Sequence, residues 1–261
     1  MTLNFKSFGH GPPLIIMHGL FGMLDNWQTI AKQLASDYSV YTVDLRNHGR
    51  SPHSDEFDYC IMAADIVEFM ESHGFYTAHM MGHSMGGKVA MQVAMEYPDH
   101  VQKLIVVDIA PKLYAPGHTW IFNALASVDF SIIHSRNMVE AVLLQQIDSA
   151  SIVRFLMKNI ARNPSGGYQW RMNLDVIRSK YENVSGEVIA GDPFDGPTLF
   201  LRGGMSPYIT LDDWPQIEEL FPNAVLETIR GAGHWVHAEE PEVLLEMVRG
   251  FLGGIIKGKM H

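Results

Sequence analysis

A serine stands between glycines in the stretch Gly82-His83-Ser84-Met85-Gly86, where it could act as a nucleophile. The residues Thr77–Met81 before it predict a strand, and Lys88–Tyr97 after it has apolar residues at helical spacing. A sharp strand-to-helix turn strains its central residue and needs small neighbours, which glycine provides. We therefore expect a nucleophile elbow with Ser84 exposed at the carboxyl end of the strand. The alternative is a glycine-rich turn with an incidental serine, since this pattern recurs by chance.

A serine nucleophile needs a general base, and this architecture places a histidine late in the chain. The loop Gly231–His237 follows the last expected strand and contains His234, which has a glycine before it. An imidazole with an ordinary pKa near 6.5 suits this role. We select His234 from the thirteen histidines on its strand-end position and flanking glycines. His237 is the second candidate, although a packing role suits it better.

A negative charge that develops on a carbonyl oxygen needs backbone N–H donors. One expected donor is the amide of Met85, directly after the nucleophile at the start of a helix. The other is the amide of Leu20, which follows His18-Gly19 at the end of an apolar strand, with Phe21 as the alternative. The side chains of Leu20 and Phe21 could line the substrate site as well.

Composition excludes several other classes of function. The 261 residues carry a net charge of −10 without a cluster of lysine and arginine, which argues against a nucleic-acid partner. No apolar run approaches the ~18 residues of a membrane span, and Met1–Gly11 lacks the pattern of a signal peptide. The single cysteine, Cys60, fits a reducing compartment and reads as a small packing residue rather than a nucleophile. We expect a cytoplasmic protein that is a monomer or a small homo-oligomer.

Apolar strand-like runs alternate with helical patterns in two parts of the chain, which is typical of a parallel sheet with crossover helices. Residues 1–110 and 198–261 are expected to form this α/β core. Residues 111–197 show helical rather than strand patterns and predict an inserted cap over the carboxyl ends of the strands, where such sheets bind ligands. The expected strands are Thr2–Phe8, Leu14–Met17, Ser39–Val43, Thr77–Met81, Leu104–Val107, Thr198–Leu201 and Ala224–Ile229. The expected helices begin near Asp25 or Asn26 and then cover Ile61–His73, Lys88–Tyr97, Trp120–Ala126, Met138–Gln145, Ile152–Ala161, Trp170–Tyr181, Asp213–Phe221 and Pro241–Phe251.

Taken together, these motifs resemble the α/β-hydrolase superfamily over nearly the whole chain. The stretches that carry the resemblance are His18-Gly19-Leu20-Phe21-Gly22, Asp44 to Ser51, Gly82 to Gly87 and Gly231 to His234. More narrowly, Arg46-Asn47-His48-Gly49, Asp108-Ile109-Ala110-Pro111 and Gly233 to Ala238 are similar to the small bacterial carboxylesterases of the YbfF type. The resemblance implies a mostly parallel sheet, with the Asp44–Ser51 segment as a structural turn.

The acidic partner of His234 departs from the superfamily norm. The loop Arg202–Pro207, where an aspartate is usual, has no acidic residue. Asp108 ends the strand that follows the elbow, and adjacent strand ends lie only ~4.8 Å apart, so its carboxylate could reach the histidine. The resemblance assigns the acid to Asp108. Asp212 and Asp213 are rivals that look more like helix-capping residues.

These residues predict a serine hydrolase that cleaves short- to medium-chain carboxylic esters through an acyl-enzyme, with Ser84, His234 and Asp108 as its triad. No cofactor is expected, and no histidine spacing indicates a metal. Acyl-CoA thioester hydrolysis, perhydrolysis and carbon–carbon bond hydrolysis remain alternatives on the same scaffold, as does a non-catalytic binding protein. Trp120, Phe122, Leu125 and Phe130 could form an acyl pocket or simply the core of the cap.

Overall fold

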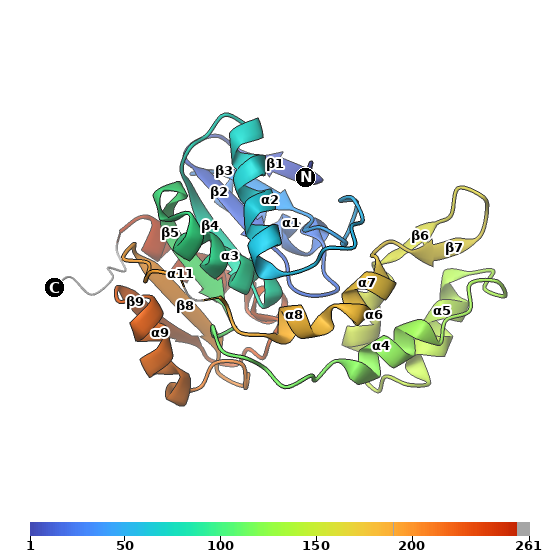
Figure 1. Cartoon of the computed structure of the whole chain (residues 1–261). Helices are drawn as coiled ribbons and strands as arrows, with labels where there is room; N and C mark the ends of the chain where they lie inside the picture. Colours follow the sequence, from blue (N-terminus) through green and yellow to red (C-terminus); the bar gives the residue numbers. More distant parts are fainter. Residues whose placement is uncertain (190, 255–261) are drawn as a thin grey trace.

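Seven strands form one sheet that is parallel except at one edge (Figure 1). The computed structural model describes residues 1–189 and 191–254. In this range the sheet order is β1-β3-β2-β4-β5-β8-β9, and only the β1–β3 pair is antiparallel. The strands are β1 Phe5–Phe8, β2 Pro13–Met17, β3 Ser39–Val43, β4 Ala78–His83, β5 Val101–Val107, β8 Thr198–Gly203 and β9 Ala224–Ile229. The α/β fold class predicted from the sequence is confirmed.

Helices cover both faces of this sheet, which explains why every residue of β4 is buried and why β2 is apolar at every position. Successive residues of β2 alternate between two buried clusters: Ile15 and Met17 face one, and Leu14 and Ile16 face the other. Helices α2 (Tyr59–Ser72), α3 (Met85–Glu96) and α9 (Trp214–Leu220) pack on the first face. Helices α1 (Gln28–Leu34) and α11 (Pro241–Leu252) pack on the second.

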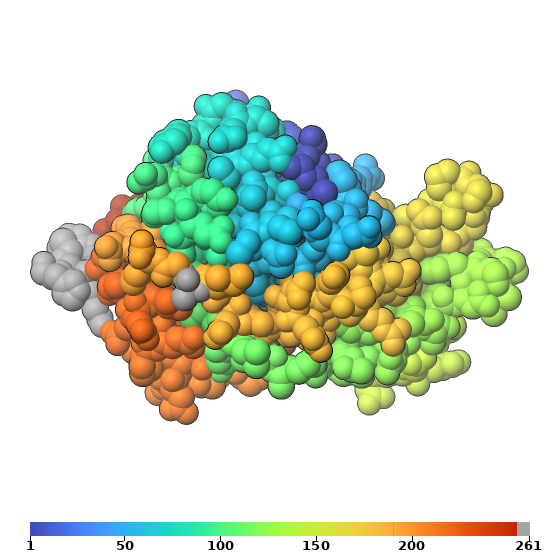
Figure 2. All heavy atoms as spheres, viewed as in Figure 1, coloured from blue at the N-terminus to red at the C-terminus, as the bar shows by residue number. Residues whose placement is uncertain are grey.

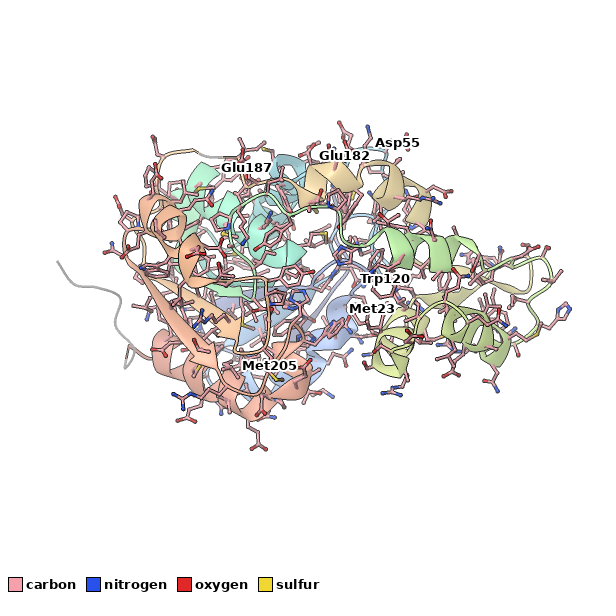
Figure 3. All side chains as sticks on the ribbon, turned by 90° about the horizontal axis from the view of Figure 1, so that it is seen from below. Met23, Asp55, Trp120, Glu182, Glu187 and Met205 are labelled. Carbon is pink, nitrogen blue, oxygen red and sulfur yellow. The ribbon has the colours of Figure 1, made fainter. Side chains whose placement is uncertain are left out.

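Residues 119–185, which lie between β5 and β8, form a mostly helical segment that we call the insertion. It contains α4 Thr119–Ala126, α5 Arg136–Leu144, α6 Ala150–Met157, β6 Ile160–Arg162, β7 Tyr168–Trp170, α7 Leu174–Ser179 and α8 Tyr181–Ser185. Most of it extends from one end of the sheet as a lobe (Figures 1 and 2), and Trp120 lies at the base of this lobe (Figure 3). Its buried residues, Phe122 and Leu156 among them, join the apolar cluster of the sheet. No helix in the described ranges combines the length and apolarity needed to cross a membrane.

The structure differs from the expected elements mainly within the insertion. Ile160 and Ala161 were expected at the end of a helix, and Trp170 at the start of one, yet they pair in the antiparallel hairpin β6–β7. The connecting turn includes Gly166 and Gly167, whose positive φ angles of 105° and 77° are conformations that glycine adopts readily.

Four short elements outside the insertion also differ from those expected. Helix α1 is preceded by the short 3-10 helix η1, Leu24–Trp27, which begins before either expected cap residue. Two short helical turns, η2 (Pro98–His100) and η3 (Leu211–Asp213), flank β5 and α9. The short helix α10, Val236–Glu239, begins two residues after the predicted base, His234, and has no periodic signal because it is a single turn.

Candidate active site

Ser84 lies at a strained turn between β4 and α3. Its φ of 53° and ψ of −121° are unusual for a residue with a side chain, and neighbouring glycines permit the turn. A Cβ atom on Gly82 would lie 2.0 Å from the Gly86 carbonyl oxygen. One on Gly86 would lie 2.5 Å from the carbonyl oxygens of both Met17 and His18. The small residues are therefore required where α3 closes on β4 and β2, as expected for a nucleophile elbow.

Asp108 directly follows β5 and is fully buried. Its Oδ1 accepts a hydrogen bond of 2.9 Å from the Gly203 amide at the end of β8. Its Oδ2 accepts from His234 Nδ1 at 2.8 Å and from the Ser206 hydroxyl. The Gly203 and Ser206 donors therefore hold the carboxylate in place while it accepts from the His234 imidazole. This geometry suits a triad acid.

His234 is held on three sides. Besides Asp108 at Nδ1, its carbonyl oxygen accepts a 2.7 Å hydrogen bond from Nε2 of the buried His83. The Tyr208 ring stacks on its imidazole, with 4.0 Å between centroids and 20° between planes. Because Nδ1 is bonded to Asp108, Nε2 is the nitrogen left to accept a proton.

Ser84 and His234 line the same cavity. This cavity has a volume of about 50 Å³, is the smaller of two at Ser84, and is also lined by Phe155 and Trp235. Ser84 also lines a second cavity of about 350 Å³, whose wall includes Met85 and Lys88. Among the described residues the hydrogen bonds of His234 do not include one to Ser84 Oγ, so the structure places the pair on one cavity without joining them.

The loop after β2 lies beside Ser84, since a Cβ on Gly19 would be 3.1 Å from Ser84 Cβ. The Phe21 amide donates to His48 Nε2 at 3.3 Å and is therefore engaged. The amides of Leu20 and Met85 form no hydrogen bond with another described group. Of the two loop amides considered, Leu20 is therefore the one available to a substrate oxygen.

Two buried histidines hold this loop in place. His18 Nδ1 donates to the Gly19 carbonyl at 2.8 Å, and its Nε2 accepts from the Leu45 amide at 3.1 Å. His48 Nδ1 likewise donates to the Arg46 carbonyl, which leaves its Nε2 to accept from Phe21. Burial lowers the pKa of His18 to about 4 and that of His48 to about 3, so both rings are neutral at pH 7 and can accept these amides.

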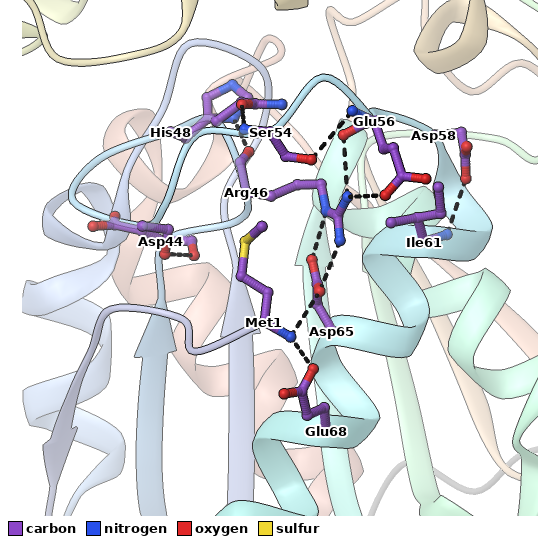
Figure 4. A network of polar contacts seen from close by, with 12 residues as sticks. Met1, Asp44, Arg46, His48, Ser54, Glu56, Asp58, Ile61, Asp65 and Glu68 are labelled. Atoms are coloured by element: carbon purple, nitrogen blue, oxygen red, sulfur yellow. Dashed lines mark hydrogen bonds and ion pairs between the residues drawn. The ribbon is translucent and has the colours of Figure 1, made fainter.

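The segment Asp44–Ser51 forms the structural turn expected from the resemblance. The Asp44 carboxylate accepts from the amides of Leu24 and Arg50 at 2.7 and 2.8 Å. The Arg46 guanidinium donates two hydrogen bonds, of 2.7 and 2.9 Å, to the buried Asp65 of α2 (Figure 4). Both contacts are structural, because they anchor the turn to the core and not to a cavity.

The rival candidates have other partners. Asp213 pairs with Lys112 at 2.7 Å and accepts from the Thr210 amide, as a capping residue does. The His237 ring stacks on Trp27 at 4.4 Å, and burial lowers its pKa to about 3. Burial and the nearby Glu96 raise the pKa of the Cys60 thiol to about 12, which keeps it protonated and unreactive.

Three of the four apolar residues singled out at the start of the insertion are packing residues. Phe122 and Leu125 are buried in the main cluster, Phe130 packs against it, and Trp120 is 44% exposed. None of the four is among the residues that line the two cavities at Ser84.

The sequence reasoning missed Ser206 and Lys88. Ser206 occupies the loop that lacks an acid, and it donates to Asp108 instead of replacing it. The Lys88 ammonium is buried and donates to the carbonyl oxygens of Lys112, at 2.6 Å, and Gly186. Burial lowers its pKa to about 7. Its position one turn after Ser84, on the same face of α3, was the available signal.

Comparison with known proteins decides the family. The sequence model of the family described as the alpha/beta hydrolase fold matches residues 12–241. The chain belongs to the α/β-hydrolase family. It is 36% identical to esterase YbfF of Escherichia coli over 92% of each chain. It is 40% identical to an sn-1-specific diacylglycerol lipase of Xenopus laevis, over 93% of this chain and 80% of that protein.

A solved structure of a marine microorganism esterase superposes on this hydrolase with a TM-score of 0.93 at 44% identity, over 95% of this chain and 98% of the other. Among the described residues, no three His, Cys, Asp or Glu side chains gather closely enough to hold a metal ion.

Proposed function

We propose that this hydrolase is a carboxylesterase that cleaves short- to medium-chain acyl esters through a Ser84–His234–Asp108 triad. The observation that carries the proposal is the meeting of a strained serine with an aspartate-bound histidine on one cavity. The names of its relatives, two esterases and a lipase, support ester hydrolysis.

In the first step, Ser84 Oγ attacks the ester carbonyl carbon while His234 Nε2 takes its proton. The carbonyl oxygen gains the negative charge and accepts hydrogen bonds from the Leu20 and Met85 amides. The C–O bond to the alcohol then breaks, and His234 returns the proton to the leaving oxygen. A water molecule repeats the sequence on the acyl-enzyme and releases the acid. Asp108 holds the imidazole with Nδ1 protonated and stabilises its positive charge.

The two cavities divide the ester between them. The leaving oxygen must approach His234 to be protonated, and His234 lines only the smaller one. The alcohol portion therefore occupies the smaller cavity. The acyl portion occupies the larger, whose volume of about 350 Å³ is lined by Tyr59, Tyr114, Tyr181 and Tyr208 among others. Residues 111–197 then act as the cap, since Tyr114 and Tyr181 both belong to this range.

The test is hydrolysis of p-nitrophenyl esters of graded acyl length by the purified protein. We expect activity that falls for long acyl chains, is abolished in Ser84→Ala, and parallels labelling of Ser84 by a fluorophosphonate. Acyl-CoA substrates assayed alongside distinguish an esterase from a thioesterase. Absence of both turnover and labelling in the wild-type protein would refute the proposal.

A further inference from the structure

Phe21 has a conformation that needs support. Its φ of 60° lies in the left-handed region, which a bulky side chain rarely adopts because the conformation is strained. It follows Leu20, whose amide we assign to the oxyanion site, so the conformation of Phe21 helps to set the direction of that amide. The Phe21 amide is held from the core, by His48. The contacts that hold the carbonyl and the ring of Phe21 therefore affect catalysis.

Two further contacts of Phe21 come from the insertion. Asn159, between α6 and β6, donates from Nδ2 to the Phe21 carbonyl oxygen at 2.7 Å. Asn159 is fully buried and Phe21 is 2% exposed, so water does not compete for this bond. The Phe21 ring packs edge-on against Phe122 of α4, with 5.2 Å between centroids.

The backbone of Asn159 is fixed, and its side-chain amide has no other hydrogen-bond partner among the described residues. The Arg171 amide donates to its backbone carbonyl at 2.7 Å, which ties it to the segment after β7. Its Oδ1 is buried and has no hydrogen-bond partner within the described ranges. A buried unpaired acceptor is unfavourable, so the hydrogen bond from Nδ2 to the Phe21 carbonyl is the side-chain contact that offsets the burial of Asn159.

We propose that Asn159 is a positioning residue that holds the oxyanion loop, His18–Gly22, in its active conformation from the insertion. This inference depends on the proposed esterase function. The insertion thus completes the oxyanion site as well as covering it. Losing the Asn159 bond leaves the Phe21 carbonyl buried without its donor and the left-handed turn without support on one side, so the Leu20 amide is less well directed.

A matched control lies nearby. Asn173 of the same insertion donates from Nδ2 to Asn47 Oδ1 at 3.1 Å, and Asn47 also has a positive φ, of 65°. This contact joins the insertion to the Asp44–Ser51 turn and not to the oxyanion loop. Asn159→Leu and Asn173→Leu each remove one such contact at similar volume, so their difference isolates the effect on the loop.

The experiment measures ester hydrolysis, thermal unfolding and affinity for a trifluoromethyl ketone, which forms an oxyanion on Ser84. We expect Asn159→Leu to lower kcat about 10- to 100-fold with KM nearly unchanged, and to weaken the ketone by a similar factor. Asn173→Leu should change kcat less than about threefold. Asn159→Ala replaces the leucine variant if that protein does not fold.

Equal effects of the two asparagine variants on kcat, or a change confined to KM or melting temperature, would overturn the inference while leaving the esterase function intact. A wild-type protein that hydrolyses no ester and is not labelled at Ser84 would refute both.

Discussion

At the scale of single residues, the candidate site depends on one carboxylate with three donors. Asp108 accepts from Gly203, His234 and Ser206, so its orientation does not depend on the histidine alone. The loop that carries a triad aspartate in related folds supplies two of these donors here. The loop itself has no acidic residue, so in this chain it donates to the Asp108 carboxylate instead of supplying one.

The substitution Asp108→Asn tests this assignment. An amide cannot accept from all three donors, and it favours the wrong histidine tautomer, so kcat should fall about 10³- to 10⁴-fold while the fold is retained. The check is steady-state hydrolysis together with circular dichroism. Asp213→Asn, which removes the charge that pairs with Lys112, should cost less than about tenfold. A large loss in Asp212→Asn or Asp213→Asn with an active Asp108→Asn would contradict the assignment.

Sequence reasoning located the residues whose role depends on local geometry. The glycines around Ser84 and the strand-end position of His234 are visible in short stretches of sequence. Ser206 and Asn159 could not be found in this way, because the residues that they contact are 98 and 138 positions away in the sequence. Nothing in their neighbours distinguishes them from ordinary polar loop residues.

At the scale of elements, the elbow requires α3 to approach β2 closely. Gly86 is the point of contact, because its Cα lies beneath the carbonyl oxygens at the end of that strand. These oxygens belong to backbone and cannot rotate away as a side chain can. Because Gly86 has no side chain, the first turn of α3, which carries the Met85 amide, can lie against the end of β2.

Gly86→Ala should therefore destabilise the protein by about 1 to 3 kcal/mol and reduce ester hydrolysis, since α3 must shift to make room. Urea unfolding at pH 7.5 measures the first effect. Gly117→Ala is the control, because its Cβ would have its nearest neighbour, the Ala115 carbonyl oxygen, at 3.8 Å. Equal stability of the two variants would show that the close approach is not required.

The strands were predicted better than the insertion, for a physical reason. A strand buried on both faces, such as β2, is apolar at every position and is bounded by turn residues. In the insertion, short amphipathic segments satisfy helix and hairpin patterns equally well, and tertiary pairing decides between them. Gly166-Gly167 was the signal for the β6–β7 hairpin.

At the scale of the whole molecule, several histidines are buried in neutral form. Burial lowers the pKa of His18, His48 and His237 near the site, and lowers that of His79 on β4 to about 4. Below pH 6.5 the unfolded chain binds protons at these positions, whereas the folded chain does not until the pH falls near its own lower pKa values. The free energy of unfolding must therefore decrease as the pH falls from 6.5 toward 4.

His79 allows this linkage to be measured away from the candidate site. A histidine with a pKa of 6.5 unfolded and about 4 folded makes unfolding easier by about 2 kcal/mol at pH 5 relative to pH 8. His79→Leu removes this contribution, so its loss of stability between pH 8 and pH 5 should be smaller than that of the wild type by this amount. Urea unfolding at the two pH values gives the comparison. The control is His134→Leu, because the side chain of His134 is exposed to solvent. If His79→Leu and the wild type lose equal stability on acidification, His79 is not neutral in the fold, and burial does not cause the acid sensitivity at this position.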